Sequence, residues 1–293
     1  MTKVAFSTIA CPEWTLSRVA RFAAEHEFDG IEFRTFGEGS TRFAHDPGLT
    51  DAAKVAATLR RHGVEACSLA TGLRFDHAVS PPVLGHLLPS RWSDVRPAFH
   101  MVELAQRLGS PLVRVFPFEI PAVPLESRGS TIKRIVSRLQ MVCDHCRHRD
   151  AFVAIENAGD FATADDLVEI IARVDSPYLL ACYDLYAAVQ VDDDVAAGVR
   201  KLGPRLAMAR LRDRIATGSN PGPAPLGEGD LPTQRFVSTL VETGFDGWLV
   251  YEWERAWLPE LAAAETVLPN AVRTIHRWLN EASGSATTNH SAA

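Results

Sequence analysis

The sequence predicts a single α/β domain folded as a closed (β/α)8 barrel, or TIM barrel, and three observations support this fold class. Short apolar runs alternate with longer stretches of helical periodicity along the chain. Eight such runs occur, and eight parallel strands joined by helical crossovers close without leaving a sheet edge. A length of 293 residues suits one barrel. We expect the barrel to span residues 1–282 and the polar residues 283–293 to form a disordered tail.

The first four predicted strands are separated by segments that carry helix caps and helix stops. The strands are Val4–Ile9, Gly30–Arg34, Val64–Ala70 and Leu112–Pro117. Thr50 is a candidate cap for a helix that ends before Gly63. Ser93 is a candidate cap for the next helix, which ends before Gly109 and leads to the fourth strand.

The last four predicted strands follow the same order of strand, helix and strand. They are Ala151–Glu156, Tyr178–Asp184, Leu206–Arg212 and Gly247–Glu252. Thr163 is a candidate cap for a helix that ends near Val174. The phrase Phe-Asp-Gly precedes both the second and the eighth strand. A doubly wound open sheet is the alternative fold, but the first strand is not followed by the glycine-rich turn that binds phosphate there.

Composition and charge restrict the class of partner. The formal net charge of -6 and the pI near 5.9 give no electrostatic footprint for binding nucleic acid or an anionic membrane surface. The N-terminus lacks the pattern of a secretory signal, and no apolar run is long enough to span a bilayer. Five scattered cysteines suit a reducing compartment. We therefore expect a cytoplasmic protein that acts on a small molecule, and the sequence leaves open whether it forms a homo-oligomer.

Three carboxylates stand at the ends of predicted strands. Side chains alternate along a strand, so Glu156, Asp184 and Glu252 are each expected to point inward at the C-terminal mouth, where barrel enzymes do their chemistry. One such carboxylate is usually a salt bridge or a loop cap. Three of them repel one another, and that repulsion must be offset by a metal, a shared proton or a cationic side chain. The pattern therefore indicates a functional cluster.

Several arginines are expected near the same mouth. Arg210 and Arg212 share one face of the seventh strand. Further cations follow or lie on other strands: Arg34, Arg74, Arg114 and Arg255. Together they favour an anionic substrate, although Glu32 could simply pair with one of them. Tyr186 is a candidate hydrogen-bond donor near Asp184.

Five motifs stand at or beside the ends of predicted strands: Ala154-Ile-Glu-Asn157, Tyr183-Asp-Leu-Tyr186, Arg210-Leu-Arg-Asp213, Leu226-Gly-Glu-Gly-Asp230 and Phe245-Asp-Gly-Trp-Leu-Val-Tyr-Glu252. They resemble motifs of the xylose-isomerase-like TIM barrels, and most closely those of the sugar phosphate isomerase/epimerase group. The resemblance runs from about Lys3 to Leu279. It implies a divalent metal held by Glu, Asp, His and Glu, with Glu156, Asp184 and Glu252 as its three carboxylate ligands. It also implies that Glu156 and Glu252 exchange protons with substrate.

Two positions depart from that family pattern. Arg210 stands where the family has its metal-binding histidine, and Ala187 stands where the family has a substrate-facing histidine. A guanidinium has no lone pair to offer a metal. At about 4 Å from a divalent ion it would be repelled by about 8 kcal/mol if the effective dielectric constant is roughly 20.

Two versions of the site follow from the departure at Arg210. In the first, the three carboxylates hold Mg2+ or Mn2+ by oxygen alone. In the second no metal binds, and Arg210 with Arg212 neutralises the carboxylates or grips a substrate oxyanion. We favour the first.

The leading functional hypothesis is an isomerase-like or epimerase-like enzyme that acts on a small hydroxy-carbonyl compound, such as a sugar, a polyol derivative or a hydroxy-keto acid. Glu156 and Glu252 would move a proton through an enediolate, which the metal or Arg210 would stabilise. The expected substrate-binding residues are Arg210, Arg212, Glu32, Arg34, Arg114 and Tyr186. The alternatives are a dehydratase, or a catalytically lapsed barrel that only binds a ligand; nucleic-acid cleavage fits poorly because no histidine stands at a strand end.

Overall fold

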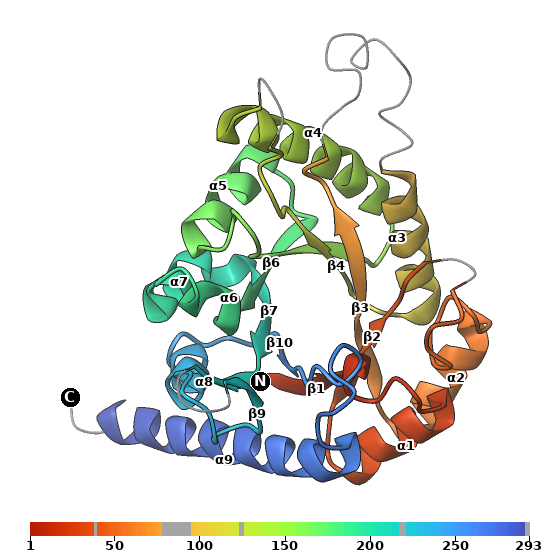
Figure 1. Cartoon of the computed structure of the whole chain (residues 1–293), viewed down its shortest axis with the longest axis vertical. Helices are drawn as coiled ribbons and strands as arrows, with labels where there is room; N and C mark the ends of the chain where they lie inside the picture. Colours follow the sequence, from red (N-terminus) through yellow and green to blue (C-terminus); the bar gives the residue numbers. More distant parts are fainter. Residues whose placement is uncertain (38–39, 78–94, 123–125, 217–220, 291–293) are drawn as a thin grey trace.

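The computed structural model describes residues 1–37, 40–77, 95–122, 126–216 and 221–290. Eight parallel strands form a closed barrel in the order β1-β10-β7-β6-β5-β4-β3-β2 (Figure 1), which confirms the predicted fold class. The strands are β1 Lys3–Ser7, β2 Gly30–Arg34, β3 Glu65–Arg74, β4 Leu112–Phe116, β5 Phe152–Glu156, β6 Leu179–Asp184, β7 Leu206–Leu211 and β10 Trp248–Tyr251. All eight coincide with predicted runs, and β3 extends four residues beyond the predicted end at Ala70.

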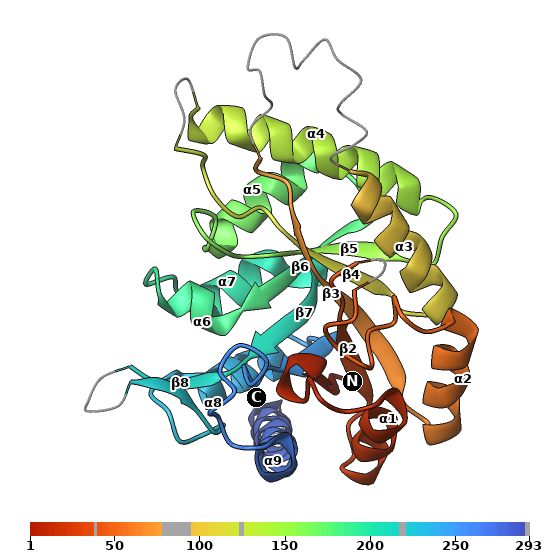
Figure 2. The same cartoon turned by 45° about the vertical axis from the view of Figure 1, so that its right-hand side comes forward.

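Helices surround the strands on the outside of the ring (Figures 1 and 2). They are α1 Leu16–Glu25, α2 Ala52–His62, α3 Arg96–Leu108, α4 Arg128–Cys146, α5 Ala164–Val174, α6 Leu185–Val189, α7 Val195–Leu202, α8 Thr233–Glu242 and α9 Ala264–His290, with short 3-10 turns at Thr8–Ala10 and Gly203–Arg205. Each longer helix turns an apolar stripe to the barrel; α5, for example, buries Leu167, Ile170 and Val174. No helix among the described residues has the length and apolarity needed to cross a membrane.

The predicted helix signals are largely confirmed. Thr163 accepts a hydrogen bond from the backbone N–H of Asp166 and forms a capping box at the start of α5. Gly63 and Gly109 end α2 and α3 with φ values of 69° and 71°, which an L side chain would adopt only with strain. The cap of α2 is Asp51 rather than Thr50, and the candidate cap Ser93 lies outside the described residues.

The last predicted loop contains a feature that the sequence does not signal. The strands β8 Asp213–Ile215 and β9 Gly222–Ala224 form an antiparallel hairpin within the connection 213–232. Strands of three residues are too short to display the alternation on which strand prediction depends. The hairpin starts directly after β7, at the C-terminal mouth of the barrel.

The end of the chain also differs from the expectation. A disordered tail was expected for residues 283–293, whereas α9 continues to His290. The buried face of α9 includes Leu268, Ile275 and Trp278, and a helix that is already anchored extends at little further cost. Disorder stays a prediction for residues 291–293, which lie outside the described part of the chain.

The barrel interior has an apolar lower layer that consists of Ala5, Cys67, Leu112, Ala154, Cys182, Met208, Trp248 and Val250. Side chains of a strand alternate, so the next inward position lies two residues closer to the C-terminal mouth. On five strands that next position is charged, and on β2 Glu32 takes the equivalent position two residues after Gly30. The set comprises Glu32, Arg114, Glu156, Asp184, Arg210 and Glu252, and we call it the charged layer. All six side chains are buried.

Candidate functional site

Arg210 is the centre of the charged layer. Its Nη1 donates to both carboxylate oxygens of Glu32, at 2.7 and 2.8 Å, and its Nη2 contacts Oε2 of Glu252. Its Nε lies 3.5 Å from Oε2 of Glu156 and 3.7 Å from Oδ2 of Asp184. The side chain is 1% exposed. One guanidinium therefore stands among four carboxylates that arrive from four different strands.

The electrostatics of this arrangement keep Arg210 positively charged and Glu32 negatively charged. Burial by itself would lower the pKa of Arg210, but attraction to Glu32, Glu156 and Asp184 outweighs it and raises the pKa above its ordinary value. Burial by itself would likewise raise the pKa of Glu32, but the charges of Arg210 and Arg114 outweigh it and lower the pKa to about 2. The two groups therefore stay ionised near neutral pH.

Glu32 should consequently make the protein less stable in acid. Its pKa in the folded protein lies below the ordinary value of 4.5, so the stabilisation is complete above pH 4.5 and is lost as the pH falls toward about 2. Between about pH 6 and about pH 3 this single group should account for about 2 kcal/mol of the decrease in the free energy of unfolding. Urea titrations of the parent protein and of Glu32→Gln measure the decrease. An equal decrease in both proteins would contradict the assignment.

Two further arginines share the same carboxylates. Arg212 donates to Oδ2 of Asp184 at 2.8 Å and to Oε1 of Glu252 at 2.9 Å. The Nη1 atom of Arg212 that donates to Glu252 also donates to Oε1 of Glu254, at 2.9 Å. Arg114 donates to Oε2 of Glu156 at 2.6 Å. The mutual repulsion of the carboxylates is thus offset by guanidinium groups.

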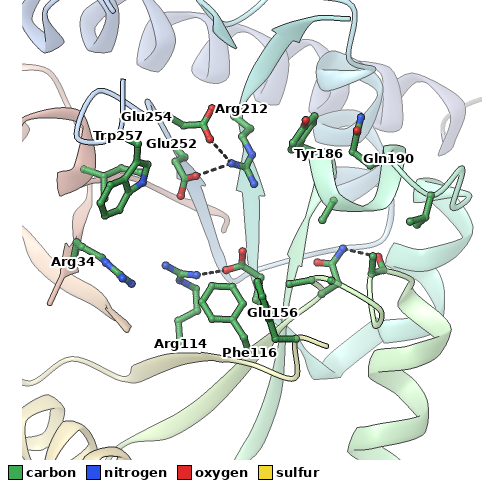
Figure 3. A pocket seen from close by; sticks show the side chains of 18 residues that line it. Arg34, Arg114, Phe116, Glu156, Tyr186, Gln190, Arg212, Glu252, Glu254 and Trp257 are labelled. Carbon is green, nitrogen blue, oxygen red and sulfur yellow. Dashed lines mark hydrogen bonds and ion pairs between the residues drawn. The ribbon is translucent and has the colours of Figure 1, made fainter. Parts of the chain in front are cut away.

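A pocket of about 460 Å3 opens above the charged layer. Six of the residues singled out from the sequence line it, namely Arg34, Arg114, Glu156, Tyr186, Arg212 and Glu252. Figure 3 shows Arg34 and Trp257 on one side of the pocket, with Tyr186 and Gln190 on the opposite side. Glu32, Asp184 and Arg210 are not part of the lining. The structure therefore brings all nine predicted site residues together but leaves three of them beneath the pocket.

Glu156 and Glu252, the two glutamates expected to transfer protons, differ in their surroundings. Oε2 of Glu156 accepts from Arg114 and also faces Sγ of Cys182 at 3.7 Å. Oε1 of Glu156 has no hydrogen-bond partner among the described residues. Both oxygens of Glu252, in contrast, contact arginines. Glu156 is therefore the better placed of the two to accept a proton from a ligand.

Two polar side chains hold the strand ends in place. Oδ1 of Asn157 accepts from the backbone N–H of Asp184 at 2.6 Å, and its Nδ2 donates to the carbonyl of the same residue at 3.1 Å. Asp213 accepts from the backbone N–H groups of Gly227 and Gly229, at 2.9 and 3.1 Å. The Gly-Glu-Gly-Asp turn thus wraps the carboxylate that directly follows Arg212, which fixes the course of the chain beyond the seventh strand.

The residues present do not fit a resident divalent metal. Asp184 uses Oδ1 to accept from the backbone N–H of Ala187 and Oδ2 to accept from Arg212. Both oxygens of Glu252 are also occupied, and the guanidinium of Arg210 stands where a cation would have to sit. Within the described ranges, no group of three or more His, Cys, Asp or Glu side chains is arranged to hold a metal ion. The contacts agree with the second version of the site, in which arginines neutralise the carboxylates.

Some residues of the mouth were missed or placed differently by sequence reasoning. Glu254 lines the pocket and pairs with Arg212 and Arg214. The alternation from Glu252 would assign it to the same face, but it lies beyond the end of the predicted strand. Arg74 pairs with Asp76 and Glu119 away from the pocket lining. Ala187 lines the pocket with only a methyl group, so the substitution of the family histidine leaves space there.

Comparisons with known proteins agree with this architecture. A model of the family described as xylose isomerase-like TIM barrel matches residues 20–281. No curated protein sequence matches the chain. Among solved structures, an L-ribulose 3-epimerase has 16% identity and a TM-score of 0.78, with 98% of each chain covered.

Two other solved structures are similar over most of their length. The D-psicose 3-epimerase from Clostridium cellulolyticum H10, crystallised with D-tagatose, has 14% identity and a TM-score of 0.72, with 96% of this chain and 99% of that chain covered. The probable 3-DHS dehydratase of petrobactin synthesis from Bacillus anthracis has 16% identity and a TM-score of 0.72, with 94% and 99% covered. At these identities the likeness shows the fold.

Proposed function

The chain belongs to the xylose isomerase-like TIM barrel family, and on that premise we propose that it is an isomerase-like or epimerase-like enzyme. Its substrate is a small hydroxy-carbonyl compound, from which it removes a proton at the carbon next to the carbonyl group. Epimerases with the same fold support this reaction class. The observation that carries the proposal is that Oε1 of Glu156 has no hydrogen-bond partner among the described residues and lies in a pocket that is also lined by three arginines.

Glu156 is the proposed base. Its Oε2 is held by Arg114, so the carboxylate has a fixed orientation, and Oε1 is available to the ligand. A carboxylate at this position removes the proton next to the carbonyl, and the carbonyl oxygen becomes an enediolate oxyanion. Arg114 and Arg212 line the same pocket and supply fixed positive charge to that oxyanion.

Glu252 and Arg210 have different proposed roles. Glu252 lines the pocket and is the second candidate for proton transfer, but arginines contact both of its oxygens, so neither oxygen is free for a ligand. Arg210 lies beneath the lining and does not touch the ligand, so it acts as a positioning residue that keeps Glu32 and Glu252 in place. No step of this proposal requires a metal.

Dehydration is the second candidate reaction. It shares the first proton removal and then expels a hydroxyl group, so a single well-placed base is sufficient to begin it. The observation that favours it is that Glu156, rather than both glutamates, keeps an unpartnered oxygen. A probable dehydratase with the same fold supports it.

Proton NMR in D2O tests the proposal directly. The protein, dialysed against a chelator, is incubated with hydroxypyruvate, dihydroxyacetone, D-ribulose and D-fructose. Deuterium should enter the carbon next to the carbonyl of at least one compound, and the product spectrum distinguishes an isomer or epimer from a dehydrated deoxy compound. Absence of exchange from the whole panel, together with saturable binding, would favour the ligand-binding barrel instead.

A further inference from the structure

Arg34 differs from the other arginines that line the pocket. Arg114 and Arg212 each contact carboxylates at hydrogen-bond distance. Arg34 makes no ion pair among the described residues; its Nη1 donates only to the carbonyl of Ala70, at 3.2 Å. Its Nε is buried and, like the Nε atoms of Arg114 and Arg212, has no hydrogen-bond partner among the described residues. A guanidinium fork therefore lies in the pocket wall with unused donor capacity.

The neighbours of Arg34 hold its guanidinium in place without neutralising its positive charge. Its Cζ lies 4.8 Å from the ring centroid of Phe36 and 5.9 Å from that of Trp257. Such rings attract a cation but carry no net charge. Burial and the charge of Arg114 lower the pKa of Arg34 to about 10, and the charges of Glu32 and Glu156 offset this only in part. Arg34 is still protonated near neutral pH, but no carboxylate of the described residues forms an ion pair with it.

We infer that Arg34 binds an anionic group of the ligand, either a carboxylate or a phosphate. This inference rests on the proposed function and narrows its substrate class from hydroxy-carbonyl compounds in general to those that carry a negative charge. A guanidinium binds either group through two parallel hydrogen bonds, which adds geometric selection to charge.

The opposite wall of the pocket explains how such a ligand lies. Tyr186 and Gln190 stand across the pocket from Arg34 and present neutral side chains. Glu156, with its unpartnered oxygen, is part of the same lining (Figure 3). A ligand whose anionic end pairs with Arg34 therefore presents its hydroxy-carbonyl part to Glu156 and Arg212, and its far end to the neutral side chains.

Binding of matched probes by isothermal titration calorimetry tests this inference without any chemical step. Gluconate is compared with sorbitol, which has the same carbon number without the carboxylate, and glycerol 3-phosphate is compared with glycerol. At least one anion should bind about 10- to 100-fold more tightly than its neutral counterpart. The pair that shows the larger ratio identifies carboxylate or phosphate as the preferred group.

Arg34→Met should remove this preference, whereas Arg255→Met should retain it. Arg255 is a matched control because it also stands at the mouth but does not line the pocket and pairs with Glu13. If Arg34→Met does not fold, Arg34→Gln, which keeps a donor without the charge, should lose the preference instead. Equal binding of anion and neutral probe by the parent protein would overturn the inference, as would a preference that survives removal of Arg34. Because no proton transfer is measured, these outcomes are independent of the role of Glu156.

Discussion

Replacement of Arg210 by methionine should lower the free energy of unfolding by about 3 to 5 kcal/mol. The variant keeps a side chain of similar length but leaves Glu32, Glu156, Asp184 and Glu252 without the guanidinium that stands among them. All four carboxylates are buried, and removal of one partner from a buried ionic cluster leaves uncompensated charge that is costly to keep away from water. Urea denaturation monitored by circular dichroism measures the change.

Arg255→Met is the matched control for this effect. Arg255 pairs with the half-exposed Glu13, and exposed pairs of this kind contribute at most about 1 kcal/mol. Added Mn2+ should raise the midpoint temperature of Arg210→Met, whose carboxylates then lack the guanidinium at their centre, but not that of the parent protein. A loss of stability no larger than that of the control would show that Arg210 does not neutralise the cluster.

Replacement of Glu156 by glutamine should reduce deuterium exchange into the substrate by about 100- to 10,000-fold, the range expected for loss of a general base. Glutamine keeps the size of the side chain and can still accept from Arg114, but it cannot accept a proton from carbon. The melting curve should therefore show a protein that is still folded under the conditions in which exchange is lost. Exchange is followed by proton NMR in D2O at a substrate concentration well above KM.

Glu119→Gln serves as the control for the loss of one negative charge. Glu119 pairs with Arg74 and lies outside the pocket lining, so its replacement should leave the exchange rate unchanged. Exchange that persists at the parent rate in Glu156→Gln would remove Glu156 from the mechanism. Exchange that is lost in Glu119→Gln as well would point to an unspecific effect of charge.

The fold and the inward carboxylates were predictable because they depend on local periodicity. The alternation of a strand assigns a face to each residue, and the last inward position of a barrel strand lies at the mouth. This reasoning placed Glu156, Asp184 and Glu252 correctly at the mouth. The hairpin in the connection 213–232 was not predictable, because it is too short to show a period.

The choice between metal and arginine was not predictable from local pattern. It depends on where the long side chain of Arg210 ends, and its main partner, Glu32, is 178 residues away in the sequence. The same limit applies to Arg34: nothing in its neighbourhood along the chain distinguishes it from Arg74 or Arg255, which have carboxylate partners. Only the folded structure distinguishes an arginine that pairs with a carboxylate of the protein from one that can bind a ligand.

We propose that Arg210 takes the place of a metal ion in this barrel. Elemental analysis by inductively coupled plasma mass spectrometry tests it most directly, on protein expressed with added Mn2+ and Mg2+ and then dialysed into metal-free buffer without a chelator. We predict that manganese, magnesium and zinc are each far below one atom per chain. One tightly held metal atom per chain in the parent protein would contradict the claim.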